Sequence, residues 1–183
     1  IMKFKKIIIM LVIGLFIFAG CSDTTNTPSK KVEDFLAKYQ NQDKDVLTQL
    51  ELTLDSDTTM DAEQKKDYKA LMTKQYQNLS YKITDEKQEN DTATVEVEIE
   101  VYDYATSITK SKEYFDKHKD EFVKDESDDA ATSKAYIDYK IKEMKDVTDK
   151  TTYQITFNLT KTDGEWTIDD ITDADRQKLH GLY

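Results

Sequence analysis

Residues 93–101 are the most regular segment of the sequence, because apolar and polar residues alternate along its whole length. The apolar set is Ala93, Val95, Val97, Ile99 and Val101, and the polar set is Thr94, Glu96, Glu98 and Glu100. A period of two places the two sets on opposite faces of a β-strand. A strand with one apolar face and one charged face fits an antiparallel sheet that is covered on one side only. The sequence therefore predicts such a sheet, with the three glutamates on its solvated face.

Two hairpins are predicted to form this sheet. The first joins residues 79–83, which also alternate, to residues 93–101 through a turn at residues 89–91. The second joins the alternating residues 153–159 to residues 166–171 through an Asp-Gly pair. Such a pair accepts the positive φ angles that a tight hairpin turn needs. The sheet is therefore expected to have about four strands.

A helical region is expected before the first hairpin. The Thr-Pro pair at residues 27–28 is a helix start signal, with a hydroxyl cap and proline at the first helical position. Apolar residues then recur with helical spacing from Val32 to Tyr39. The pattern pauses at residues 41–43 and resumes at Val46. It predicts either one kinked helix or two short ones.

Three further helical segments follow along the chain. One starts at Asp61, where Gln64 is the capping-box partner. Residues 107–148 have helical spacing on both sides of an acidic loop at residues 125–129, and residues 173–180 form a short final helix. Segregated helices and strands indicate an α+β fold. We expect N-terminal helices packed on a curved antiparallel sheet, with a helical insert at 107–148 between the two hairpins.

The N-terminal segment predicts export from the cytoplasm. Three lysines precede an apolar run at residues 7–18, and the small residues Ala19 and Gly20 then lead to Cys21 and a polar stretch. This layout is that of a secretory signal peptide, and the apolar run is shorter than the roughly 20 residues that a membrane span needs. The motif Phe18-Ala19-Gly20-Cys21 resembles the lipobox of a bacterial lipoprotein signal.

This resemblance implies cleavage between Gly20 and Cys21 and lipidation of Cys21, with palmitate among the acyl groups. The expected organisation is a signal peptide at 1–20, a lipidated flexible tether at 21–28 and a single domain at 29–183. The protein would then be held at the cell membrane and face the extracellular side. The alternative is an uncleaved N-terminal anchor, which places the rest of the chain on the same side.

Composition narrows the possible partners and chemistry. The formal net charge of −11 disfavours nucleic acid and anionic lipid as direct partners. Cys21 is the only cysteine, so its lipidation excludes thiol catalysis. Arg176 is the only arginine among many lysines, a bias that favours an AT-rich, Gram-positive source.

The order of these segments resembles the NTF2-like superfamily, which has the cystatin-like fold. The resemblance rests on the short helical segments Val32–Leu36 and Gln42–Leu47, the long strand, and the terminal run Asp163–Ile171 with its Gly-Glu-Trp motif. More narrowly, the chain is similar to NTF2-like lipoproteins of Gram-positive bacteria that have no characterised function. The resemblance implies a curved sheet wrapped around helices, with a pocket at its open end. This superfamily contains enzymes and non-enzymes, so the fold alone does not decide the function.

Asp103 is the leading candidate for an acidic residue in the expected pocket. It continues the inward row of residues 97–101 if the strand runs on without a bulge. A carboxylate on the apolar face would have a raised pKa suited to a general base, with Tyr39 or Tyr81 as a hydrogen-bond donor. Isomerases and dehydratases of the resembled superfamily use such acids and tyrosines. The alternative is that the strand ends near Tyr102 and leaves Asp103 solvated beside the next helix.

No cofactor or metal is expected from the sequence. His118 and His180 are far apart, and neither has a second ligand at helical or strand spacing. The acidic run at 125–129 does not match a calcium-binding loop, and no nucleophile or glycine-rich phosphate motif is present. The leading expectation is a non-enzymatic domain of the cell envelope that binds a small ligand, a wall fragment or another envelope protein. The alternatives are a pocket enzyme with Asp103 as the base, and a structural or immunity-type surface lipoprotein with no ligand.

Overall fold

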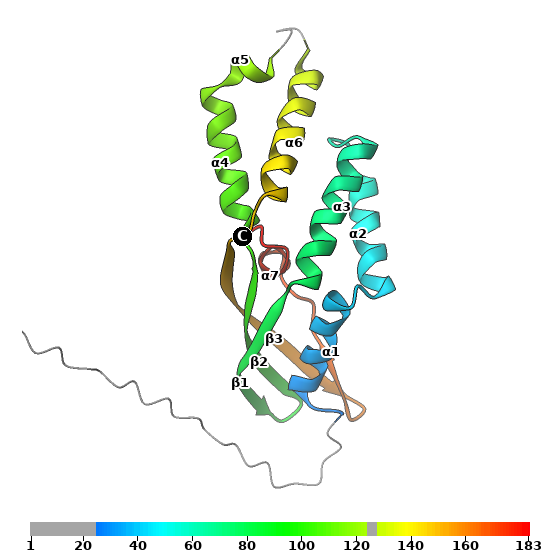
Figure 1. Ribbon diagram of the computed structural model, residues 1–183. Helices are drawn as coiled ribbons and strands as arrows, with labels where there is room; N and C mark the ends of the chain where they lie inside the picture. Colours follow the sequence, from blue (N-terminus) through cyan, green and yellow to red (C-terminus); the bar gives the residue numbers. More distant parts are fainter. Residues whose placement is uncertain (1–24, 124–127) are drawn as a thin grey trace, which may run out of the picture.

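The computed structural model describes residues 25–123 and 128–183, which form seven helices and one four-stranded antiparallel sheet (Figure 1). The predicted α+β class is confirmed. The predicted signal peptide, its cleavage site and Cys21 lie outside the described residues, as does most of the acidic loop. In the described part of the chain, no helix is both long and apolar enough to cross a bilayer.

The sheet is a simple meander in the order β1-β2-β3-β4. Its strands are β1 (Ser80–Glu89), β2 (Thr92–Tyr102), β3 (Lys150–Thr162) and β4 (Glu165–Ile168). Both predicted hairpins are confirmed. The second closes at Asp163 and Gly164, which have φ angles of 53° and 87°. The last strand ends at Ile168 instead of the expected Ile171.

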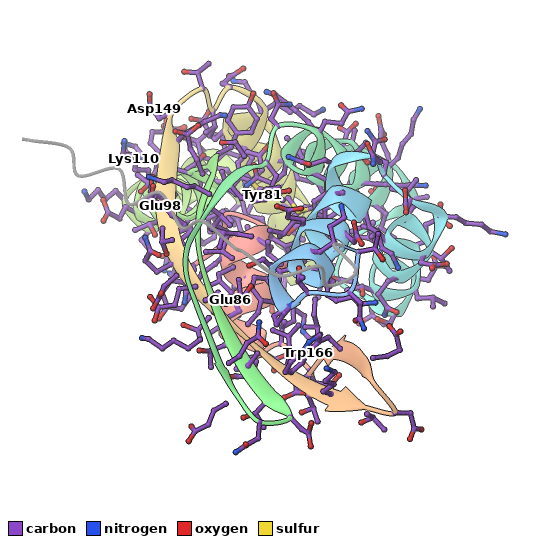
Figure 2. All side chains as sticks on the ribbon, turned by 90° about the horizontal axis from the view of Figure 1, so that it is seen from below. Tyr81, Glu86, Glu98, Lys110, Asp149 and Trp166 are labelled. Atoms are coloured by element: carbon purple, nitrogen blue, oxygen red, sulfur yellow. The ribbon has the colours of Figure 1, made fainter. Side chains whose placement is uncertain are left out.

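One face of the sheet is buried and the other is wet, as the alternation in β2 predicts. The five apolar residues of β2 are at most 5% exposed, whereas Glu96, Glu98 and Glu100 are exposed. Ile155, Phe157 and Leu159 continue the buried face on β3. Glu98 lies on the outer side of the curved sheet (Figure 2).

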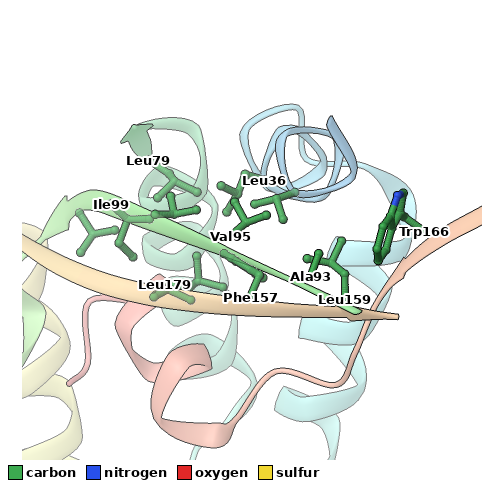
Figure 3. Packing of buried hydrophobic residues seen from close by; sticks show 13 residues of the cluster. Leu36, Leu79, Ala93, Val95, Ile99, Phe157, Leu159, Trp166 and Leu179 are labelled. Carbon is green, nitrogen blue, oxygen red and sulfur yellow. The ribbon is translucent and has the colours of Figure 1, made fainter. Parts of the chain in front are cut away.

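Helices α1 (Pro28–Gln40) and α7 (Asp173–Leu179) cover the concave face of the sheet. Val32 and Leu36 of α1 and Leu179 of α7 are at most 1% exposed among the strand residues (Figure 3). We call this group the sheet core. Its buried members are Val32, Leu36, Leu79, Ala93, Val95, Val97, Ile99, Val101, Ile155, Phe157, Leu159, Trp166 and Leu179.

Helices α1 and α2 (Lys44–Ser56) are separate, which decides between the two expectations for this region. The chain turns between them because Gln42 takes a positive φ of 55°. The Thr27 hydroxyl caps α1 as predicted, by accepting a hydrogen bond from the Lys30 N–H. The predicted capping box of Asp61 and Gln64 starts helix α3, which spans Ala62–Gln77.

The helical insert begins at Tyr104, three residues before the expected start. It consists of α4 (Tyr104–Lys117), the short α5 (Lys119–Phe122) and α6 (Asp129–Lys145), which together we call the arm. In Figure 1 the arm extends away from the sheet, and α5 lies at its far end.

A second apolar group, the helical core, joins the arm to α2 and α3. Its buried members are Leu50, Leu54, Leu71, Met72, Tyr76, Tyr104, Ile137, Ile141 and Met144. Helix α6 therefore has two packed faces, one against α3 and one against α4. Helix α4 is the outer layer, since its main helical neighbours are α6 and α5.

Candidate functional site

Asp103 does not line the concave face of the sheet, so its expected position as a pocket acid is wrong, and the alternative, in which the strand ends near Tyr102 and Asp103 lies beside the next helix, is confirmed. Strand β2 ends at Tyr102, and Asp103 is the N-cap residue of α4. Its carboxylate accepts a hydrogen bond from the Thr106 N–H at 2.9 Å, and its own N–H donates to the Asp149 carbonyl. Aspartate is a preferred N-cap, so the helix start overrides the continuation of the strand. The inward row ends at Val101.

Tyr39 is partly buried and packs against both the sheet core and the helical core. Its ring packs against Phe35 at 5.4 Å and edge-on against Tyr76 at 5.1 Å between centroids. Burial raises the pKa of the Tyr39 phenol, although Arg176 opposes the rise. Tyr39 is therefore a packing residue that connects the two cores.

Tyr81 is half-buried on β1, between the sheet and α1 (Figure 2). Partial burial raises its pKa, and Glu33 on α1 adds to the rise. No hydrogen bond or ring contact joins any two of Asp103, Tyr39 and Tyr81 in the described structure. The three predicted pocket residues therefore do not form one site.

The concave face itself is filled with side chains. Val97, Ile99 and Phe157 have no exposed area, and the Phe35 ring of α1 lies 5.6 Å from the Phe157 ring. A surface hollow of about 630 Å³ lies elsewhere, between α4 and the last described residues. Its apolar lining comes mainly from Ile108, Leu182 and Tyr183.

A hydrogen-bonded pair of Tyr76 and His180 lies between α3 and α7, with Tyr76 buried and His180 partly buried. The Tyr76 hydroxyl lies 3.1 Å from the His180 Nε2 atom, and the two rings pack at 5.6 Å between centroids. Burial, with a smaller contribution from the Arg176 charge, lowers the pKa of His180 to about 4, and burial raises the pKa of Tyr76. Both side chains are therefore neutral at pH 7, and the pair joins the two elements. Nothing in the sequence spacing indicated this pairing.

A second polar contact fixes the place where the sheet meets the arm. The buried Gln75 side chain accepts from the Tyr102 N–H at 2.8 Å and donates to the Tyr102 carbonyl at 3.0 Å. Gly181 packs directly on this contact, with a φ of 69°. A Cβ atom at position 181 would lie 2.1 Å from the Tyr102 oxygen and 2.2 Å from the Gln75 Nε2. Gln75, Tyr102 and Gly181 thus form a junction that admits no added side chain.

The arm contains an aromatic cluster that belongs to neither core. Its five rings, which we call the aromatic seam, are Tyr114, Phe115, Phe122, Tyr136 and Tyr139. Tyr114 stacks on Tyr139 at 5.1 Å, and Phe115 packs against Tyr136 at 4.8 Å. Phe122 is 7% exposed, and the other four are only half-buried.

The tyrosines of the arm differ in their burial. Tyr136 and Tyr139 are half-buried, and both contact rings of α4 or α5. Tyr104, the first residue of α4, has no exposed area and belongs to the helical core. The seam therefore gives the arm a group of four half-buried rings, and we take it as the candidate binding surface. Exposed aromatic area is also found elsewhere in the described chain, at Tyr81 and Tyr183.

The described residues contain no group of three or more histidine, cysteine or acidic side chains arranged to hold a metal ion. His118 stacks on Tyr114 with 4.1 Å between ring centroids, and its ring Nδ1 lies 2.9 Å from the Tyr114 carbonyl oxygen. His118 and His180 are therefore both engaged in packing contacts.

No protein family, curated protein or solved structure matches this chain. The resemblance to NTF2-like lipoproteins therefore stays a prediction from the sequence.

Proposed function

We propose that this protein is a lipid-anchored lipoprotein of a bacterial cell envelope, with a non-enzymatic binding or accessory domain outside the cytoplasm. The location rests on the sequence, where a basic start and an apolar run lead to the Phe18-Ala19-Gly20-Cys21 motif. The domain would stay at the membrane through Cys21 and act on molecules within reach of that surface.

The observation that carries the binding role is the half-buried aromatic seam of the arm, and the filled concave face of the sheet argues against an enclosed pocket. A pocket enzyme of the NTF2-like kind needs an open concave face with an acid on it. Here α1 and α7 occupy that face, and Asp103 caps a helix outside it. Binding would then use the outer surface, which favours a protein or a wall fragment over a small ligand enclosed in a cavity.

The fold we propose is an elaborated cystatin-like fold. Its support is the 13-residue helix α1, which packs on a four-stranded antiparallel meander. The arm and α7 would be additions, and α7 would occupy the space that a superfamily pocket uses. The filled face also favours a second candidate function, a structural or immunity-type surface lipoprotein that binds no ligand.

The anchor is tested by labelling the source bacterium with radioactive palmitate. We expect label in the wild-type protein and in the control Ser22→Ala, and none in Cys21→Ala, which should appear as an unprocessed precursor or in the medium. Continued labelling of Cys21→Ala, or unlabelled wild-type protein in the cytosol, contradicts the anchor.

The binding role is tested by photo-crosslinking in the same cells. A photoreactive phenylalanine analogue replaces Tyr136 on the aromatic seam or, as a control, Thr156 on the wet face of the sheet. We expect a defined crosslinked product from position 136 and none from position 156. Crosslinks from neither position favour the structural alternative, and equal crosslinks from both contradict binding through the arm.

A further inference from the structure

The described chain begins at one end of the molecule, where the Asn26 side chain is hydrogen-bonded to the second hairpin. The Asn26 side chain donates to the Gly164 carbonyl at 2.8 Å and accepts from the Trp166 N–H at 3.2 Å. These bonds join residues that are 138 and 140 positions apart in sequence. Thr27 follows at once as the cap of α1. The position of Asn26 is therefore fixed relative to the sheet.

Both hairpin turns lie at this same end. The Lys161 N–H donates to the Asp91 carbonyl at 2.8 Å, and Thr92 pairs with Thr160, so the two turns are adjacent. We call this region, formed by residues 89–92 and 162–165, the turn end. In Figure 1 the turn end and the far end of the arm lie at opposite ends of the molecule.

The chain between the proposed anchor and this end is short. Cys21 and Asn26 are five residues apart, so even a fully extended chain spans at most about 18 Å. The molecule is much longer than that. The 11 residues of β2 rise about 37 Å, and the 14 residues of α4, which continue away from the turn end, add about 21 Å. The far end of the arm is thus on the order of 50 Å from the turn end.

Charge does not select the orientation, because acidic side chains lie on both surfaces in question. The wet face of the sheet displays Glu96, Glu98 and Glu100, and the turn end displays Glu89, Asp91, Asp163 and Glu165. A bilayer rich in anionic lipid repels either surface within a Debye length. The short tether is therefore what holds the turn end near the headgroups.

We infer that the turn end faces the lipid headgroups and that the arm points away from the membrane. This inference rests on the proposed lipid anchor at Cys21. The partner of the turn end is the headgroup layer of the bilayer, held within about 18 Å by the short tether without insertion of protein side chains. The aromatic seam is then presented on the order of 50 Å further out, where proteins or wall fragments can reach it.

The orientation can be measured with the protein's own fluorophore, because Trp166 is the only tryptophan and lies beside the turn end. The chain from Cys21 onward, which contains every described residue, is coupled through its single thiol to a maleimide lipid in anionic vesicles. The vesicles also carry dansyl-labelled headgroups as energy acceptors. We expect strong energy transfer from Trp166 to dansyl.

Two comparisons make the test decisive. In Trp166→Phe combined with Tyr136→Trp, the single donor moves to the arm, and we expect transfer to fall several-fold. In a chain with about 20 Gly/Ser residues inserted after Thr24, the donor stays in place and folding is untouched, yet the longer tether should also reduce transfer from Trp166. Circular dichroism confirms that each variant is folded.

Equal transfer from positions 166 and 136, or stronger transfer from position 136, overturns the orientation. Transfer from Trp166 that does not change on insertion of the linker overturns the tether as the cause of the orientation, because the short tether would then not set the distance. The lipid is supplied chemically in these vesicles. The result is therefore independent of whether cells lipidate Cys21, which the palmitate experiment decides.

Discussion

The sheet core and the aromatic seam are packed in opposite ways. Most of the sheet core is aliphatic, and each of its thirteen buried residues is at most 5% exposed. The seam consists of five aromatic rings, of which Phe122 alone is buried. The free energy of unfolding increases with the apolar area that folding removes from water. Each residue of the sheet core therefore contributes more stability than each residue of the seam. The seam leaves aromatic area available for a partner, as tyrosine-rich binding surfaces do.

The connection between these two regions is partly polar. Gln64 of α3 donates to the Lys134 carbonyl at 3.1 Å and to the Asp138 carboxylate at 2.7 Å on α6. Further along the same pair of helices, Lys145 pairs with Asp67 at 2.6 Å. Polar contacts of this kind hold two elements in register while adding little net stability. The arm is therefore expected to open locally more readily than the sheet.

Truncation of one ring in each region gives the largest expected contrast. Phe157→Ala empties a site with no exposed area and should cost about 3–5 kcal/mol of unfolding free energy. Phe122→Ala lies in a four-residue helix at the end of the arm and should cost about 1–3 kcal/mol. Denaturant titration followed by circular dichroism measures both values.

Amide hydrogen exchange identifies the helices and strands that each substitution destabilises. Phe157→Ala should speed exchange throughout β2 and β3, whereas Phe122→Ala should speed it only in α4 and α6. Equal costs for the two variants, or faster exchange of the sheet in Phe122→Ala, would mean that the arm and the sheet unfold as one unit.

A methyl group at the junction tests how tightly the two regions are joined. In Gly181→Ala the new Cβ meets the Tyr102 oxygen at 2.1 Å and sits on a residue with positive φ. Strain and overpacking should together cost about 3 kcal/mol. The matched control is Gly164→Ala, which also has a positive φ but has no atom within 4 Å of the new Cβ. It should cost about 1 kcal/mol, so a similar loss in both variants would show that φ alone matters.

His180 makes the junction sensitive to acid. Burial lowers the pKa of the folded protein's His180 to about 4, below the value of about 6.5 for an unfolded chain. Between these two values the unfolded chain binds more protons. The stabilisation by neutral His180 is therefore complete above pH 6.5 and is lost as the pH falls toward 4. The full loss is about 3 kcal/mol.

The matched variant for this prediction is His180→Gln, which keeps a polar group near the Tyr76 hydroxyl but does not titrate. Unfolding free energies of both proteins are measured from pH 4 to pH 7. The wild type should lose more stability than the variant on acidification, which separates His180 from the carboxylates that also titrate. Parallel curves would show that His180 titrates normally in the folded protein.

The sequence predicts most of the sheet because its strands alternate strictly. One face is buried, so a slip of one residue would move every apolar side chain into water, and the pattern of residues 93–101 is confirmed residue by residue. The helix starts at Thr27 and Asp61 were also predictable, because the capping side chains are adjacent to the positions they cap.

The position of Asp103 was left open by the sequence for a related physical reason. Asp103 fits two local patterns, the inward row of a strand and a site beside the next helix, and the choice depends on where β2 ends. The structure shows the second, and the same end of β2 places Tyr104 at the start of α4, where it is buried. Contacts over long sequence separations, such as Tyr76 with His180 and Asn26 with Trp166, leave no periodic signal at all.

The smallest expected effect concerns the polar connection of the arm to α3. Gln64 is buried and its side chain bonds to α6 and to the Asp61 N–H. Gln64→Ala should cost about 1 kcal/mol of global stability, because the lost hydrogen bonds are partly replaced by water. Its effect on exchange should be confined to the start of α3 and to α6. Gln77→Ala, at the exposed end of the same helix, is the control and should change neither quantity. If Gln64→Ala also speeds exchange in β2 and β3, the polar connection transmits stability between the arm and the sheet, and the two regions are less independent than their packing indicates.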